Sequence, residues 1–92
     1  MIRSFKGDAE IIWNGERSRK LPFEIQQRAY RRLQWPDAAA ELADLALPPS
    51  NRLHALAGER EGQHSISISM KWRICFVWRN GGAEHVEITD CH

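Results

Sequence analysis

The second half of the chain alternates apolar and polar residues over three stretches, at residues 64–70, 72–79 and 86–90. A period of two is typical of half-buried β-strands. The apolar positions predicted to face the core are Ile66, Ile68 and Met70, then Trp72, Ile74, Phe76 and Trp78, then Val86 and Ile88. Asn80-Gly81-Gly82 separates the last two stretches, and these residues adopt positive φ at little cost, so the two strands are expected to form an antiparallel hairpin.

The first half of the chain has helical spacing instead. After Pro22, which suits the first turn of a helix, apolar residues recur at every fourth position from Ile25 through Ala29 to Leu33. This pattern predicts an amphipathic helix that Trp35-Pro36 breaks. A second helix over residues 38–45, capped by Asp37, is expected to complete a helical hairpin.

The remaining segments predict shorter elements. Residues 2–5 and 52–57 are strand candidates, and residues 8–13 are expected to form a short helix that Asp8 caps and Asn14-Gly15 ends. Ninety-two residues suffice for one domain. The fold expected for residues 1–92 is therefore a single α+β domain, with two to three N-terminal helices packed on an antiparallel sheet of four to five strands.

No apolar run approaches the roughly 20 residues that span a bilayer, and the first residues lack the apolar segment of a secretory signal. The chain is therefore expected in the cytoplasm, without membrane contact. Cys75 and Cys91 have no metal-ligand spacing and are expected to be reduced thiols.

A net charge of +1 conceals a basic N-terminal region, because residues 1–36 carry eight Lys or Arg against four Asp or Glu. Such a patch attracts a polyanion even when the whole chain is nearly neutral, although a solvated helix face is an equally good interpretation of the pattern alone. The residues predicted to contact RNA phosphates are Arg17, Arg19, Lys20, Arg28, Arg31 and Arg32.

The polar residues that could carry chemistry are His54, His64, Arg73, His85, Asp90 and His92. None has the spacing of a metal site, and there is no glycine-rich phosphate loop or nucleophile elbow, so neither a metal nor another cofactor is expected. Histidine, carboxylate and arginine on neighbouring strands suit cleavage of RNA by its own 2′-hydroxyl. A base takes the hydroxyl proton, an acid protonates the departing 5′-oxygen, and a cation stabilises the phosphate.

His92 has an additional feature, because Asp90 and the terminal carboxylate would both favour its imidazolium form. It is therefore the candidate general acid. The alternative for a strand histidine such as His64 or His85 is a structural or surface role, and Arg73 could simply cover the outer face of the sheet.

A series of motifs spans essentially the whole chain: Met1-Ile-Arg-Ser-Phe, Pro48-Pro49-x-Asn51-Arg52-Leu53, Leu56-x-Gly58, Gly62-Gln63-x-Ser65-Ile66, Trp72-Arg73-Ile74-Cys75-Phe76-x-Trp78 and Val86-Glu87-Ile88-x-Asp90-x-His92. This series resembles the HigB toxins, or killer proteins, of the RelE/ParE superfamily. The resemblance implies a compact RelE-like domain that acts as the toxin of a type II toxin-antitoxin system. Such toxins typically enter the ribosomal A site, cut mRNA without a metal and inhibit translation.

The resemblance also implies partners and roles. A HigA antitoxin, a helix-turn-helix protein, usually neutralises such a toxin and represses the shared operon. The toxin would therefore contact operator DNA only through the antitoxin. The free toxin is expected to be a monomer. Family members place catalytic or phosphate-binding side chains at positions matching His54, Arg73, Asp90 and His92. Arg73 would stabilise the scissile phosphate, His92 would act as the acid, and His54 or Asp90 would act as the base or an orienting group.

Two positions depart from the family pattern, and two other functions are kept open. Cys91 replaces a common tyrosine, which could stack on a base, and Ser67 replaces a common arginine, so slower turnover is expected. One alternative is a ParE-like inhibitor that binds DNA gyrase. The other is a weakly active toxin that serves mainly as an antitoxin-binding corepressor.

Overall fold

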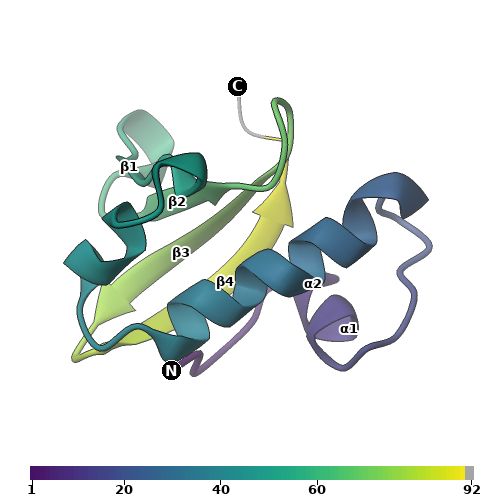
Figure 1. The fold of residues 1–92 in the computed structure, drawn as a ribbon, viewed down its shortest axis with the longest axis horizontal. Coiled ribbons are helices and arrows are strands. Elements are labelled where there is room, and N and C mark those ends of the chain that lie inside the picture. The colour runs from purple at the N-terminus through teal and green to yellow at the C-terminus, as the bar shows by residue number, and fades with distance from the viewer. Residues whose placement is uncertain (91–92) are drawn as a thin grey trace.

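The computed structural model describes residues 1–90, so Cys91 and His92 lie outside the described residues. Its four-stranded antiparallel sheet has the order β1-β2-β3-β4. The strands are β1 (His54–Ala55), β2 (His64–Ser67), β3 (Arg73–Arg79) and β4 (Gly82–Thr89). Figure 1 shows α2 (Phe23–Ala38) crossing one face of the sheet, with α1 (Ala9–Trp13) against it. The expected α+β class is confirmed, and the antiparallel sheet has four of the four to five strands expected.

The β3–β4 hairpin forms where the sequence predicts it. Asn80 and Gly81 adopt φ values of 52° and 75°, and Arg79 pairs with Gly82. A two-residue turn with both φ values positive matches the twist of the flanking strands. The register then shifts between Cys75 and Val77, opposite His85, which has a φ of 53°. This irregularity is a β-bulge, and it places His85 on the surface.

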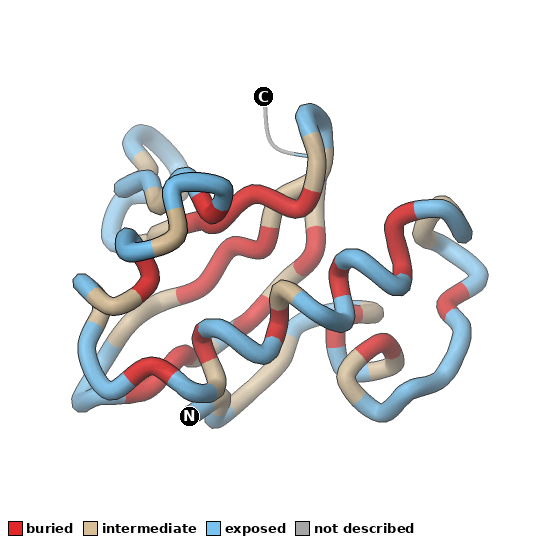
Figure 2. The backbone as a smooth tube through the Cα atoms, viewed as in Figure 1, coloured by how far each residue is buried: buried red, intermediate tan, exposed pale blue. Residues whose placement is uncertain are grey.

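The core lies between α2 and the sheet. Figure 2 shows buried residues concentrated along the strands and recurring along α2. The predicted core positions that are buried are Ile25, Ala29 and Leu33 from α2, and Ile66, Ile68, Ile74, Phe76, Val86 and Ile88 from the sheet region. Trp72 and Trp78 are partly buried and pack against this core.

Met70 was predicted to face the core, and that prediction is wrong because its side chain is 100% exposed. The strand β2 ends at Ser67, and the chain then turns back towards β3. The backbone N–H groups of Ile68 and Ser69 both donate to the Trp72 carbonyl, so Met70 lies at the tip of this turn. Its apolar character continues the alternating pattern, but no strand extends to it.

The predicted break at Trp35-Pro36 is also wrong, because α2 continues to Ala38 with Pro36 inside it. Pro36 is fully buried. A proline removes one backbone hydrogen bond of the helix, a cost that is tolerable in the last turn when the ring packs in the core. Asp37 caps no second helix; its carboxylate instead accepts a hydrogen bond from the Ile2 N–H at 3.1 Å.

The predicted helix over residues 38–45 is replaced by a short 3₁₀-helix, η1 (Leu42–Ala46), so there is no helical hairpin. The Asp44 carboxylate accepts the backbone N–H groups of Ala40 and Glu41, which begins this turn after an extended residue. Two further 3₁₀ turns follow, η2 (Pro49–Asn51) and η3 (Gly58–Arg60). The predicted strand over residues 52–57 is shortened to β1, because Arg52 has a φ of 48° and is not extended.

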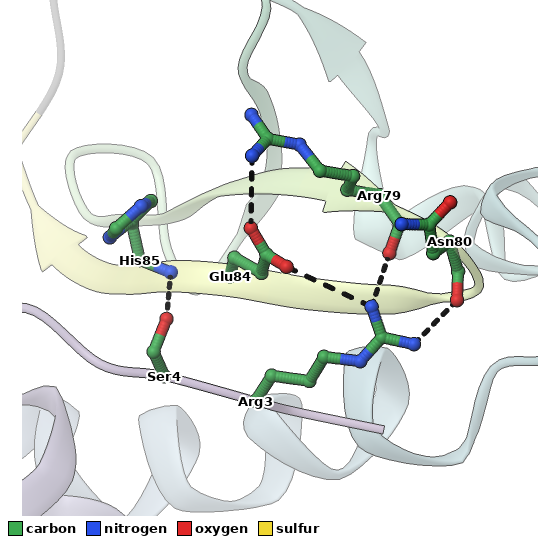
Figure 3. Close-up of polar contacts among 6 residues, drawn as sticks. All are labelled: Arg3, Ser4, Arg79, Asn80, Glu84 and His85. Atoms are coloured by element: carbon green, nitrogen blue, oxygen red, sulfur yellow. Dashed lines mark hydrogen bonds and ion pairs between the residues drawn. The ribbon is translucent and has the colours of Figure 1, made fainter.

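The N-terminal segment pairs with β4 through two isolated parallel bridges, Ile2 to Ala83 and Phe5 to Val86, rather than as a full strand. Figure 3 shows the Arg3 guanidinium against the hairpin turn, where it donates to the carbonyls of Arg79, at 2.7 Å, and Asn80. Glu84 lies 3.8 Å from Arg3. The segment thereby covers an edge that would otherwise expose unpaired backbone groups.

Among residues 1–90, no helix is both long enough and apolar enough to cross a membrane.

Candidate functional site

An open cavity of about 940 Å³ lies between residues 52–60, the start of β3 and the end of β4. Its lining includes His54, Arg73 and Asp90, which are three of the four predicted catalytic residues. His54 is in β1, Arg73 begins β3, and Asp90 directly follows β4. The antiparallel pairing therefore gathers residues that are far apart in the sequence. The fourth residue, His92, lies outside the described residues.

Arg73 is half-buried and fixed on two sides. Its Nε–H donates to the Ser65 hydroxyl at 2.7 Å, and Nη2 donates to the Arg52 carbonyl at 2.9 Å. An arginine has five N–H donors, and no described residue accepts a hydrogen bond from Nη1. The guanidinium is thus oriented by protein acceptors while retaining donors for an anion in the cavity.

Arg52 and Arg60 line the same cavity, although sequence reasoning did not select them. Arg52 is exposed, and the left-handed conformation of its backbone lets the chain reverse before β1. Arg60 donates from Nη1 to Glu87 at 2.9 Å and to Gln63 at 3.1 Å. The sequence offers one indication that these arginines belong to the site, because both lie within six residues of His54.

The cavity therefore combines an imidazole, two carboxylates, from Glu59 and Asp90, and three guanidinium groups. Guanidinium groups match phosphate oxygens in charge and geometry. Histidine and aspartate can accept or donate a proton near neutral pH when suitably placed. This arrangement can bind a phosphodiester and transfer protons beside it.

The predicted phosphate-binding residues of the basic region do not line this cavity. Arg17, Arg19 and Lys20 lie in the loop between α1 and α2, which Figure 1 shows at the opposite end of α2 from β1 and η3. Arg28 and Arg31 are exposed on α2. The guanidinium of Arg17 stacks over the Phe23 ring at 4.4 Å.

Arg32 has an evident structural role. Its Nη1 donates to the Asn51 side-chain oxygen at 2.6 Å and to the Ser50 hydroxyl at 3.2 Å. Asn51 is fully buried, and its amide donates to the Leu45 carbonyl at 3.2 Å. Arg32 therefore joins α2 to the segment that leads into the cavity.

His64 and His85 do not join the cavity lining. The His64 ring stacks on Phe76 with a centroid distance of 6.4 Å, and its Nδ1 is buried without a partner among the described residues. His85 is exposed at the β-bulge. Among residues 1–90, no three side chains of the histidine, cysteine, aspartate or glutamate type come close enough to hold a metal ion.

Comparison with known proteins identifies the family. Residues 5–92 match a family model described as the RelE-like toxin of the type II toxin-antitoxin system HigB. The chain belongs to the HigB-like toxins. Since type II toxins are paired with an antitoxin, membership implies an antitoxin partner, and the resemblance found in the sequence motifs is confirmed.

Two HigB relatives agree with this assignment. The chain is 37% identical over 68 residues to Toxin HigB-1 of Vibrio cholerae serotype O1, a match covering 74% of this chain and 72% of that protein. It is 34% identical over 93 residues to Endoribonuclease HigB of Proteus vulgaris, and this match covers both chains completely. The HigB-like match includes all the residues that line the cavity.

Proposed function

We propose that this HigB-like toxin is an endoribonuclease that cuts mRNA in the ribosomal A site and thereby inhibits translation. The observation that carries the proposal is the cavity in which a doubly fixed Arg73 lies with His54 and Asp90. The name of the Proteus vulgaris relative, which is an endoribonuclease, supports the same chemistry.

In the proposed reaction, the 2′-oxygen of the RNA forms a bond to the adjacent phosphorus, and the bond from phosphorus to the 5′-oxygen breaks. His54 or Asp90 accepts the 2′-hydroxyl proton or orients the group that does so. Arg73 stabilises the additional negative charge on the phosphate. His92 donates a proton to the departing 5′-oxygen. Side chains supply each of these roles, so the proposal requires no metal.

The proposed partners follow from this activity and from the family. Residues 1–92 act as one toxin domain in the cytoplasm, as a monomer when free, and a HigA-type helix-turn-helix antitoxin binds it and links it to operator DNA. The exposed cations of the α1–α2 loop and α2 contact ribosomal RNA phosphates, which makes the association salt-dependent. None of these cations lines the cavity, so contact with the ribosome and cleavage would use different residues.

The decisive experiment maps the 5′ ends of mRNA after the toxin is induced in cells that lack its antitoxin. New ends inside translated frames are expected with the wild-type chain and should be strongly reduced with Arg73→Ala. Because Arg73 also makes two structural hydrogen bonds, Arg73→Lys and His54→Ala provide further variants of the cavity. His85→Asn is the matched control, since it changes an exposed histidine outside the cavity and asparagine tolerates positive φ.

Cleavage by folded Arg73→Ala and His54→Ala at the wild-type rate would contradict the assignment of the cavity. Growth arrest with intact messages would instead favour a gyrase inhibitor, and the absence of arrest would favour a corepressor. The first outcome would reject the cavity as the catalytic site, and either of the other two would reject the proposed nuclease.

A further inference from the structure

Ser65 is a buried polar residue beside the candidate site, although it does not line the cavity. Its side chain is 0% exposed, and its hydroxyl oxygen lies 2.7 Å from the Nε of Arg73. The residue is in the middle of the sheet, where it pairs with His54 on one side and Cys75 on the other. A serine at such a position requires an explanation, because burying an unpaired hydroxyl is unfavourable.

The register explains how the two side chains meet. Ser67 is directly opposite Arg73 across β2 and β3, so Ser65 is its diagonal neighbour two residues away. Alternate residues of a strand point to the same face, and a long side chain reaches a diagonal neighbour on that face. The stem of Arg73 therefore extends back over β2 towards β1, where the Arg52 carbonyl receives the Nη2 hydrogen bond at 2.9 Å.

Two acceptors on different segments define the plane of the guanidinium. With the Arg52 carbonyl alone, the group could rotate about a single hydrogen bond. The Ser65 hydroxyl adds a second fixed point at Nε, and no acceptor among residues 1–90 takes Nη1, which is left for the cavity. A planar group that donates several hydrogen bonds binds phosphate well only when its orientation matches the anion.

We propose that Ser65 is a positioning residue, which holds the Arg73 guanidinium in the orientation needed to contact the scissile phosphate. This inference rests on the proposed nuclease function. Ser65 touches no substrate and acts only through Arg73. Without its hydroxyl, the half-buried Nε–H would lose its acceptor, and the guanidinium would sample orientations that do not meet the phosphate.

Ser67 provides a matched control on the same strand and the same face. It is also buried, at 8% exposure, but its hydroxyl donates to the Ser69 carbonyl at 2.9 Å and not to Arg73. Ser65→Ala and Ser67→Ala therefore each remove one buried hydroxyl from β2. Only the first change removes a partner of the arginine.

The test measures cleavage of mRNA on programmed ribosomes by the two serine variants, alone and combined with Arg73→Ala. We expect Ser65→Ala to lower kcat by roughly 10- to 100-fold with little change in KM, because displacement of a group that contacts the transition state has effects of that order. Ser67→Ala should cleave at close to the wild-type rate. In the Arg73→Ala background, Ser65→Ala should cause no further loss, since the group that it positions is already absent.

A second readout is independent of activity. The Nε–H proton of Arg73, followed by NMR, should exchange with solvent more rapidly in Ser65→Ala than in the wild-type chain or in Ser67→Ala. Wild-type kcat in Ser65→Ala, unchanged exchange of this proton, or an equal further loss in the Arg73→Ala background would each overturn the inference. If the wild-type chain cuts no RNA, the proposed function fails by itself, and proton exchange still decides whether Ser65 fixes Arg73.

Discussion

Replacing Arg32 by alanine should destabilise the fold, whereas replacing the adjacent Arg31 should not. Both arginines belong to the basic set that the sequence assigns to RNA phosphates, but the structure gives them different surroundings. Arg31 is exposed on α2. Arg32 is half-buried and donates to the side chain of Asn51, which is 0% exposed, at 2.6 Å.

The size of the effect follows from the contacts that are lost. A hydrogen bond to a charged group contributes roughly 1.5–3 kcal/mol, and the longer, exposed bond from Arg32 to Ser50 adds little. The Asn51 oxygen would also lose a charged donor in a buried position. We therefore expect a loss of about 2 kcal/mol in the free energy of unfolding, which lowers Tm by roughly 8–16 °C in a chain of this size. Arg31→Ala should change the free energy by less than about 0.5 kcal/mol.

Urea unfolding of the wild type and both variants measures the difference. The midpoint should fall for Arg32→Ala with an unchanged m-value, since the same surface is exposed on unfolding. Equal stability of the two variants would refute the structural role of Arg32. The salt dependence of ribosome binding is a separate readout, in which Arg31→Ala should reduce the slope by about one phosphate contact if the exposed face of α2 binds RNA.

Two further substitutions test the fold at positions that the structure defines sharply. In Gly82→Ala, the new Cβ would lie 2.7 Å from the Nε of Arg3 and 3.0 Å from the Met1 carbonyl oxygen, so displacing the N-terminal segment should cost about 1–3 kcal/mol in thermal or urea unfolding. A Gly82→Ala variant as stable as the wild type would show that the segment does not pack there. Met70→Ser should change the free energy of unfolding by less than about 0.5 kcal/mol, because the side chain is 100% exposed. A loss of several kcal/mol would show instead that Met70 packs in the core.

The sheet could be predicted because its signals are local. Alternation over consecutive residues placed Ile66, Ile74, Phe76 and Val86 in the core, and Asn80-Gly81 carries the preference for positive φ in its own backbone. Each of these inferences needs only the residue and its immediate neighbours. Contacts with residues distant in the sequence did not change these outcomes.

The incorrect predictions at Pro36 and Asp37 concern a place where distant contacts prevail over local preference. Proline disfavours the interior of a helix, yet burial of Pro36 keeps α2 intact through its last turn. Asp37 has the chemistry of a helix cap, but the N-terminal segment lies close enough for its carboxylate to bind the Ile2 N–H. Neither the burial nor the long-range partner can be read from the residues around position 36.

The same reasoning applies to the site. Its candidate residues on the strands, His54, Arg73 and Asp90, could be selected from chemistry and from the family resemblance, and the structure brings these three together. Ser65 could not be selected, and Arg52 was indicated only by its proximity to His54. Their contacts with Arg73 depend on the chain reversal before β1 and on the register of β2 against β3.

The segment that lines most of the cavity, residues 52–60, contains only one two-residue strand and one 3₁₀ turn. The pairing of β1 with β2 and the contacts of Arg60 with Gln63 and Glu87 hold part of it, and two arginine side chains outside it add further contacts. Arg32 binds Asn51, which directly precedes this segment, and Arg73 binds the carbonyl of Arg52, the first residue of the segment. An arginine from the helical layer and an arginine from the sheet thus secure the same short stretch of chain. Loosening either contact should disturb the cavity before it unfolds the sheet, since a segment with few backbone hydrogen bonds opens at lower free energy than the strands.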